Sequence, residues 1–149
     1  MSLRADISYA RNCSPRDLRI VAEALAWLAI LRLATLTLPF RRVAPILGLT
    51  LVTPVDVAED PVDGNGRTER IGWAVRAAAA RTPWTSTCLV QSLAGFVMLR
   101  RRHLRSTVYL GVAKDGRTGF AAHSWLQCGD RVLTGDGALR SFSVIAAYG

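Results

Sequence analysis

Three residues in the second half of the chain could together form a thiol hydrolase site: Cys88, His123 and Asp136. A thiolate can attack a carbonyl carbon, an imidazole can hold the thiol proton and pass it to a leaving amine, and a carboxylate can orient the imidazole. Each residue also has a structural explanation, because a lone cysteine is commonly buried filler and an aspartate between glycines is typical of a turn. Their meaning therefore depends on the elements that hold them.

Cys88 stands at the beginning of a predicted helix. Residues 85–87 (Thr-Ser-Thr) are all of the type that caps helix N-termini, and Pro83 before them ends any earlier helix. A thiol at this place lies near the positive end of the helix dipole, which favours thiolate. The apolar residues after the cysteine recur at roughly helical spacing and predict one buried face: Leu89, Leu93, Phe96, Val97 and Leu99.

The residues after this helix predict an antiparallel sheet. Segments rich in β-forming residues at 107–113, 120–127 and 131–134 are separated by short turns that contain glycine. Residues 139–148 add an edge strand or a tail. The fold class is therefore α+β, with the cysteine helix packed on a meander of strands.

The predicted strands bring His123 and Asp136 within reach of each other. His123 shares one face of the second strand with Ala121 and Trp125, because side chains alternate along a strand. Asp136 follows the third strand, so two antiparallel strands joined by a tight turn could place it beside His123. The other histidine, His103, lies in a run of arginines, which favours His123 as the base.

The N-terminal half begins with a strongly apolar helix. Residues 14–17 (Ser-Pro-Arg-Asp) have the pattern of a helix start, and residues 18–38 are apolar apart from a few charges before Pro39 ends the segment. Glu23 and Arg32 would be costly at bilayer depth and lie on opposed sides of the helix. We interpret the segment as a buried or interfacial helix, and association with a membrane surface stays open.

The remaining segments complete the expected organisation. Residues 44–66 are rich in proline and glycine and predict a loop, and Thr68 is the expected cap of a helix at 69–81. We therefore divide the chain into an N-terminal helix and linker (1–66) and a core (67–149). The cationic run at 100–103 is either a solvated helix end or a patch for an acidic partner.

Composition narrows the class of protein. The chain has 149 residues, half of them hydrophobic, and a net charge of +8, which fits an acidic peptide or an anionic membrane better than nucleic acid. Its three cysteines have no zinc-ligand spacing, and no signal peptide is visible, so a reducing, cytoplasmic environment with free thiols is expected. No spacing of ligands implies a metal or organic cofactor.

Four ordered blocks of the sequence resemble the lasso-peptide biosynthesis B2 proteins, which are leader peptidases with a transglutaminase-like, papain-type fold. The resemblance covers about residues 68–137, and the apolar N-terminal helix is also similar to the front of these proteins. The blocks are Cys88–Leu93, Leu99–Arg102, Val108–Val112 and Phe120–Leu126.

The resemblance implies a role for each candidate site residue. Cys88 matches the family nucleophile, His123 the general acid and base, and Asp136 the orienting carboxylate, with Asp130 as the alternative third member. Gln91 lies one turn after the cysteine, but the backbone amide of Cys88 at the helix start is the better oxyanion donor.

The resemblance also implies partners. Family members of this size act with a separate leader-binding protein (a RiPP recognition element) on a precursor peptide, and a lasso cyclase accepts the product. Two alternatives remain open: a transglutaminase-like thiol acyltransferase that uses the same three residues, and a non-catalytic scaffold that binds peptide or membrane.

Overall fold

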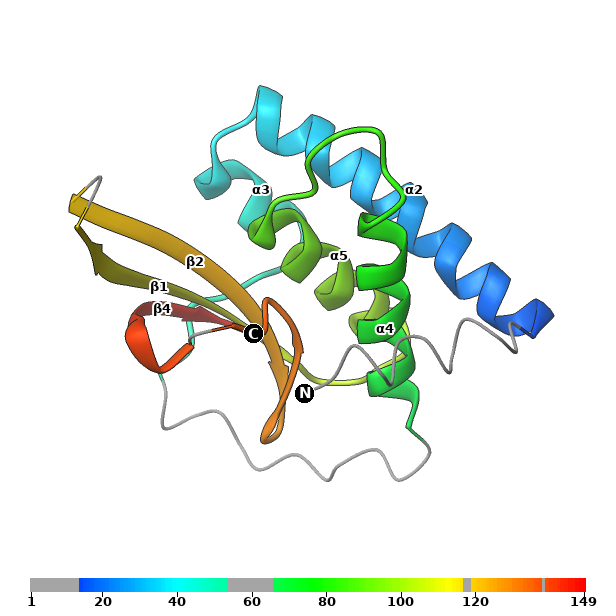
Figure 1. Cartoon of the computed structure of the whole chain (residues 1–149). Helices are drawn as coiled ribbons and strands as arrows, with labels where there is room; N and C mark the ends of the chain where they lie inside the picture. The colour runs from blue at the N-terminus through cyan, green and yellow to red at the C-terminus, as the bar shows by residue number, and fades with distance from the viewer. Residues whose placement is uncertain (1–13, 54–65, 117–118, 138) are drawn as a thin grey trace.

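Helices packed against one antiparallel sheet form the fold of the computed structural model (Figure 1). The structure describes residues 14–53, 66–116, 119–137 and 139–149. Cys13 and most of the loop predicted before residue 66 lie outside the described residues. The predicted α+β class, with a cysteine-bearing helix on an antiparallel sheet, is confirmed.

The first described helix, α2 (Pro15–Thr37), begins as its sequence predicts. Ser14 is the N-cap, Pro15 occupies the first turn, and Asp17 completes a capping box. The Ser14 N–H donates to Asp17 Oδ2 at 3.0 Å, and the Arg16 N–H donates to Ser14 Oγ at 3.2 Å. These reciprocal bonds satisfy backbone groups that have no partner inside the helix.

A second helix, α3 (Phe40–Ile46), extends three residues into the segment 44–66 that was predicted as a loop. Pro45 suggested irregular backbone, but it lies in the last turn of this short helix, whose N-cap is Pro39. The chain then joins the sheet, since Thr50 and Val52 donate backbone hydrogen bonds to the carbonyls of Gly149 and Ala147. Residues 50–52 of this connection are therefore held by backbone hydrogen bonds beside β4.

The next helix, α4 (Arg67–Ala79), starts two residues before its predicted beginning. Thr68 is not its cap, contrary to prediction: it lies in the first turn with its residue 3% exposed. The N-cap is Gly66, which has a left-handed backbone conformation with a φ of 64° and provides no side-chain hydrogen bond to the helix. Glycine adopts this conformation without steric cost, which explains the earlier start.

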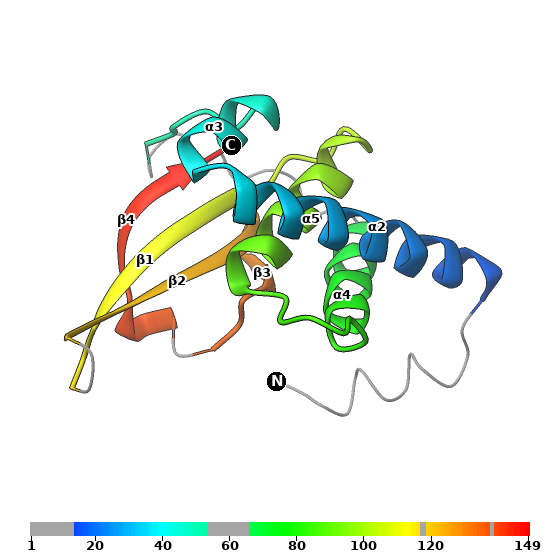
Figure 2. The same ribbon diagram turned by 90° about the horizontal axis from the view of Figure 1, so that it is seen from above.

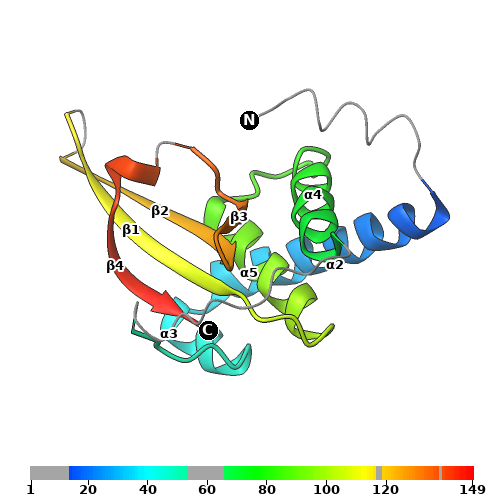
Figure 3. The same ribbon diagram turned by 90° about the horizontal axis from the view of Figure 1, so that it is seen from below.

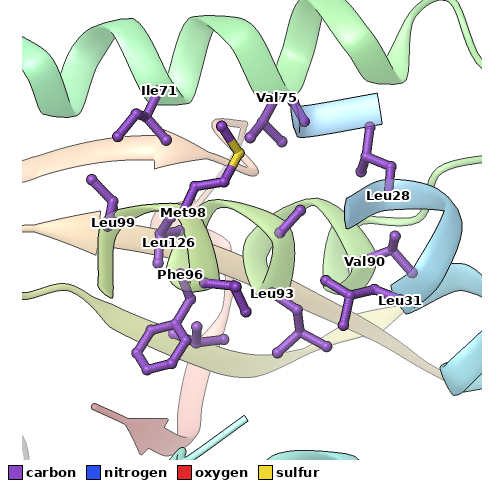
Figure 4. Close-up of a cluster of buried hydrophobic side chains, with 14 of the residues drawn as sticks. Leu28, Leu31, Ile71, Val75, Val90, Leu93, Phe96, Met98, Leu99 and Leu126 are labelled. Carbon is purple, nitrogen blue, oxygen red and sulfur yellow. The ribbon is translucent and has the colours of Figure 1, made fainter. Parts of the chain in front are cut away.

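The cysteine helix, α5 (Cys88–Arg100), lies in the centre of the molecule. Residues 92–99 are all buried, so the single buried face expected from its apolar spacing is too narrow a prediction. Figure 4 shows why: Ile71 and Val75 of α4 cover one side, while Leu93 and Phe96 point toward the strands. A helix enclosed on both sides needs apolar residues around its whole circumference.

The sheet has four strands in the order β3-β2-β1-β4. A short 3₁₀ helix lies between β3 and β4 in the chain. The strands are antiparallel, and the first three match their predicted positions closely. The last strand does not continue the meander beside β3 but pairs with β1 at the other edge. The elements are β1 (Thr107–Asp115), β2 (Gly119–Cys128), β3 (Arg131–Thr134), η1 (Leu139–Ser141) and β4 (Ser143–Tyr148).

The cationic run after α5 ties the helices together. Arg102 donates to both carboxylate oxygens of Glu23 in α2, at 3.1 and 2.5 Å, and Arg100 donates to the carbonyl of Leu47 at 2.7 Å. The run is therefore neither simply a solvated helix end nor a free patch. Its arginines bind the N-terminal helices to the end of the buried one.

Candidate active site

Cys88 is the first residue of α5, and the loop before it is held by hydrogen bonds. Thr87 is the N-cap and accepts from the Val90 N–H at 3.4 Å, as predicted for this Thr-Ser-Thr segment. The Gln91 amide donates to the Ser86 carbonyl at 2.9 Å, so this side chain holds the loop. The backbone amide of Cys88 belongs to the helix turn whose N–H groups lack partners within the helix.

His123 lies in β2 opposite Gly111 of β1. Its Nε2 is 2.8 Å from the carbonyl oxygen of Gly135, in the loop that follows β3. Because a carbonyl can only accept, Nε2 carries the proton in this hydrogen bond. In the neutral ring the lone pair is then on Nδ1, which is the form in which that atom can take a proton from a thiol.

Aromatic rings surround the imidazole on its face of the sheet. Its ring centroid is 5.1 Å from that of Phe142 and 6.3 Å from that of Trp125, which stacks in turn on Tyr109 at 5.4 Å. A Cβ at Gly111 would lie 2.9 Å from the Trp125 ring, so glycine leaves room for the cluster. Burial raises the pKa of Tyr109, which keeps its phenol neutral.

The contacts of α5 place the beginning of this helix near the same region. Ser92, one turn after Cys88, contacts Thr134 at the end of β3, and Thr134 pairs with Leu126 of β2. Figures 1, 2 and 3 agree that α5 and β2 run in the same direction, with the first turn of α5 beside the middle of β2. Cys88 precedes Ser92 in α5, and His123 precedes Leu126 in β2. Because the two elements run in the same direction, Cys88 lies nearer to the part of β2 that holds His123 than Ser92 does.

The two side chains reach this region from different sides of β2. A Cβ at Gly95 of α5 would meet Leu126 at 2.5 Å, so Leu126 points to the helix, while His123 and Trp125 alternate to the other side. Beyond Leu126, however, β2 has no pairing with β3, and Gly135 packs against the Ser124 carbonyl at this edge. The loop therefore meets the His123 ring on the face of β2 that carries Trp125.

The complete triad is not assembled among the residues that the structure describes. There, no hydrogen bond joins the Cys88 thiol to the His123 ring, and Asp136 is exposed without a hydrogen bond to the imidazole. The alternative, Asp130, is exposed in the turn where β2 and β3 meet, at the opposite end of β3 from Gly135. Position favours Asp136, and the roles of Cys88, His123 and Asp136 stay predictions.

The Gly135 carbonyl is the contact that the sequence did not predict. A backbone oxygen has no residue type to mark it, and only the Gly-Asp-Gly turn signalled unusual backbone at this position. Gly135 has a φ of 75°, which turns the chain after β3. Within the described residues, no group of three or more His, Cys, Asp or Glu side chains is placed to hold a metal ion.

The site thus combines a thiol at the start of a buried helix with a histidine on the antiparallel sheet beside that helix. The model of the transglutaminase-like superfamily matches residues 30–147, which is more than half of the chain. The chain therefore belongs to the transglutaminase-like superfamily. No curated protein and no solved structure matches it.

Proposed function

We propose that this protein is a cysteine peptidase that removes the leader from a lasso-peptide precursor. The observation that carries the enzymatic part is the Cys88 thiol at the capped start of α5, beside the strand of an imidazole whose Nε2 proton is held by Gly135. The superfamily supports cysteine peptidase or acyl-transfer chemistry. The choice of a lasso precursor is supported by the four sequence blocks described above.

In the proposed reaction the Cys88 thiolate attacks the carbonyl carbon at the end of the leader. The reaction requires the His123 ring to come within hydrogen-bond reach of the thiol. His123 then takes the thiol proton on Nδ1 and gives it to the departing amine of the core peptide, leaving a thioester on the leader. Water then hydrolyses the thioester to a carboxylate and restores the thiol. Asp136 is proposed to support the imidazolium, and the amide of Cys88 to bind the oxyanion.

We propose that the precursor arrives on a separate leader-binding protein and that a lasso cyclase takes the freed core peptide. Both partners follow from the resemblance. Cleavage is therefore best assayed with the precursor peptide and the leader-binding partner together.

The test compares Cys88→Ala with Cys128→Ala by mass spectrometry of the precursor. Cys128 is a matched control because it is the other described free thiol, is also half-buried, and donates to the Arg105 carbonyl at 3.2 Å away from the proposed site. We expect Cys88→Ala to lower cleavage by about 10³-fold or more and Cys128→Ala to leave it within about twofold. Equal cleavage by wild type and Cys88→Ala would show that the nucleophile is elsewhere.

A thiol acyltransferase is the second candidate, favoured by the superfamily itself. It would use the same thioester but pass the acyl group to an amine instead of water. Product analysis separates the two reactions: hydrolysis leaves a free carboxylate on the leader, whereas transfer leaves a new amide.

A non-catalytic scaffold is the third alternative. It is favoured by the absence, among the described residues, of a hydrogen bond between the Cys88 thiol and the His123 ring. Alkylation by iodoacetamide tests it directly, since a thiolate reacts much faster than a thiol. A catalytic Cys88 should react faster than Cys128, and His123→Ala should remove the difference. Equal slow alkylation at both positions, with no cleavage in the presence of the partner, would favour the scaffold.

A further inference from the structure

The outer face of α2 is an apolar strip on the molecular surface. Leu33 and Leu36 are 65% and 66% exposed, and Leu18 and Ile30 are 61% and 54% exposed. Figures 1 and 2 show α2 along the outside of the helical layer. The exposed residues between the first turn and the end of the helix are Leu18, Arg19, Ala22, Ala26, Ala29, Ile30, Leu33, Leu36 and Thr37.

The opposite face of α2 is part of the protein core. Ala24 and Leu28 are completely buried and Leu31 is 1% exposed. Figure 4 shows Leu28 and Leu31 beside Val90 of α5. The helix has a mean hydropathy of 1.7 over its 18-residue window, which is sufficient for a membrane span, but its core contacts would be lost if it crossed a bilayer. It can therefore lie on a membrane surface without unfolding the domain.

The exposed charged residues of α2 and of the start of α3 are all arginines. Both acidic residues of α2 are turned into the molecule, where Asp17 pairs with Arg70 at 3.5 Å and Glu23 pairs with Arg102. Arg16 and Arg19 are exposed in the first turns of α2, and Arg41 and Arg42 are exposed just after its end. An exposed apolar helix face with arginines at both ends complements an anionic lipid surface.

We propose that α2 docks the protein on the surface of an anionic phospholipid membrane, with its axis in the plane of the interface. Leu18, Leu33 and Leu36 enter the boundary between headgroups and acyl chains, and the arginines contact phosphate groups. The opposite face stays in the core, so docking needs no rearrangement of α4 or α5. This proposal is independent of the enzymatic activity.

Flotation of the full chain with vesicles tests the proposal. Vesicles of phosphatidylcholine mixed with phosphatidylglycerol should carry the protein upward, and vesicles of phosphatidylcholine alone should carry at least about tenfold less. The double variant Leu33→Gln, Leu36→Gln should lower partitioning roughly tenfold or more, because it removes exposed apolar groups without touching the core. Arg19→Gln with Arg42→Gln should lower it by a similar factor, and raised salt should have the same effect.

The matched control is Val144→Gln with Ile145→Gln on β4, two apolar residues that are 46% and 64% exposed elsewhere on the surface. This pair should leave vesicle binding unchanged, and thermal unfolding should confirm that every variant is folded. Binding that survives the Leu33 and Leu36 substitutions, or that is equal on neutral and anionic vesicles, would overturn the proposal. So would a wild type that ignores vesicles while the leucine substitutions abolish self-association or capture of a protein partner.

Discussion

The Gly135 residue connects backbone geometry to the state of the imidazole. Its φ of 75° is left-handed, and a Cβ there would lie 2.4 Å from the Ser124 carbonyl oxygen and 3.0 Å from the Trp125 Cα. Its own carbonyl oxygen is the partner of His123 Nε2. One glycine therefore fixes the path of the loop, the orientation of the ring and the nitrogen that carries the proton.

Replacing Gly135 with alanine should disturb the imidazole more than the fold. The new methyl group must push the loop from β2, so the hydrogen bond to His123 should weaken and the Nδ1–H tautomer should appear in nitrogen NMR spectra of the ring. We expect cleavage to fall about 10- to 100-fold and the free energy of unfolding to drop by about 1–3 kcal/mol.

Gly137→Ala provides the control for this prediction, because a Cβ there would meet nothing within 4 Å. It should change neither the ring spectrum nor cleavage. An unchanged tautomer in Gly135→Ala would mean that the carbonyl does not govern the ring. A large loss of cleavage in Asp136→Asn with an unchanged tautomer would instead show that the Asp136 carboxylate stabilises the imidazolium more than the Gly135 carbonyl does.

At the scale of elements, one ion pair joins α2 to the end of the buried helix. The hydrogen bond to Glu23 raises the pKa of Arg102 even though burial acts to lower it, so the guanidinium stays charged in the folded protein. Arg101 is a weaker partner, 3.8 Å from the same carboxylate with 63% of its side chain exposed. Arg101 and Arg102 therefore carry the same charge and have the same partner, Glu23, but they differ in distance and exposure.

Arg102→Ala should lower the free energy of unfolding by about 1–2 kcal/mol, because it removes two charge-assisted bonds between partly buried groups. Arg101→Ala should cost less than about 0.5 kcal/mol, as is common for exposed pairs. Chemical denaturation measures both, and Glu23→Gln combined with each completes a double-mutant cycle. Equal losses in the two variants would contradict the proposed difference between the partners.

Helix starts that are marked by nearby residues were predictable from the sequence, whereas contacts between distant parts of the chain were not. The capping residues Ser14 and Thr87 act within their own helix turn, so their side chains mark both helix starts correctly. The cap at Thr68 failed because Gly66 starts that helix through backbone conformation alone. The partner of Arg102 is 79 residues away in the chain, and no local pattern identifies such a contact.

The candidate site shows the same division. The alternation that groups His123 with Trp125 follows from the strand period and was predictable, as was the place of Cys88 at a helix start. The hydrogen bond to Gly135 depends on where β3 ends relative to β2, which is set by a register shift next to Leu126. A bulge of this kind cannot be located from residue types alone.

At the scale of the molecule, the N-terminal helices and the remaining elements share one core. Buried residues of α2, including Ala24, Leu28 and Leu31, belong to the same cluster as those of α4, α5 and the sheet. The match to the transglutaminase-like superfamily likewise begins inside α2, at residue 30. The boundary that the sequence suggested near residue 66 thus falls between elements that pack together.

This shared core predicts that residues 67–149 do not fold alone. Without α2, the apolar side of α4 and α5 faces water, so the fragment should lose the cooperative thermal transition of the full chain and bind hydrophobic dyes. Calorimetry and NMR spectra of the fragment test this. Restoring the transition by adding a peptide of residues 14–53 would confirm the cause, whereas a cooperative melt of the fragment alone would make it an independent domain.

Thr50 and Gly149 have a consequence for how the protein is made. Their backbone groups exchange hydrogen bonds of 3.1 and 3.0 Å, and Leu51 bridges to Tyr148, across nearly a hundred residues of chain. During synthesis, α2 to α5 are made before β4, and β1 keeps an open edge until β4 pairs with it. Closure of the sheet therefore waits for residues 143–149, and until they pair the open edge of β1 is a site where another chain could add.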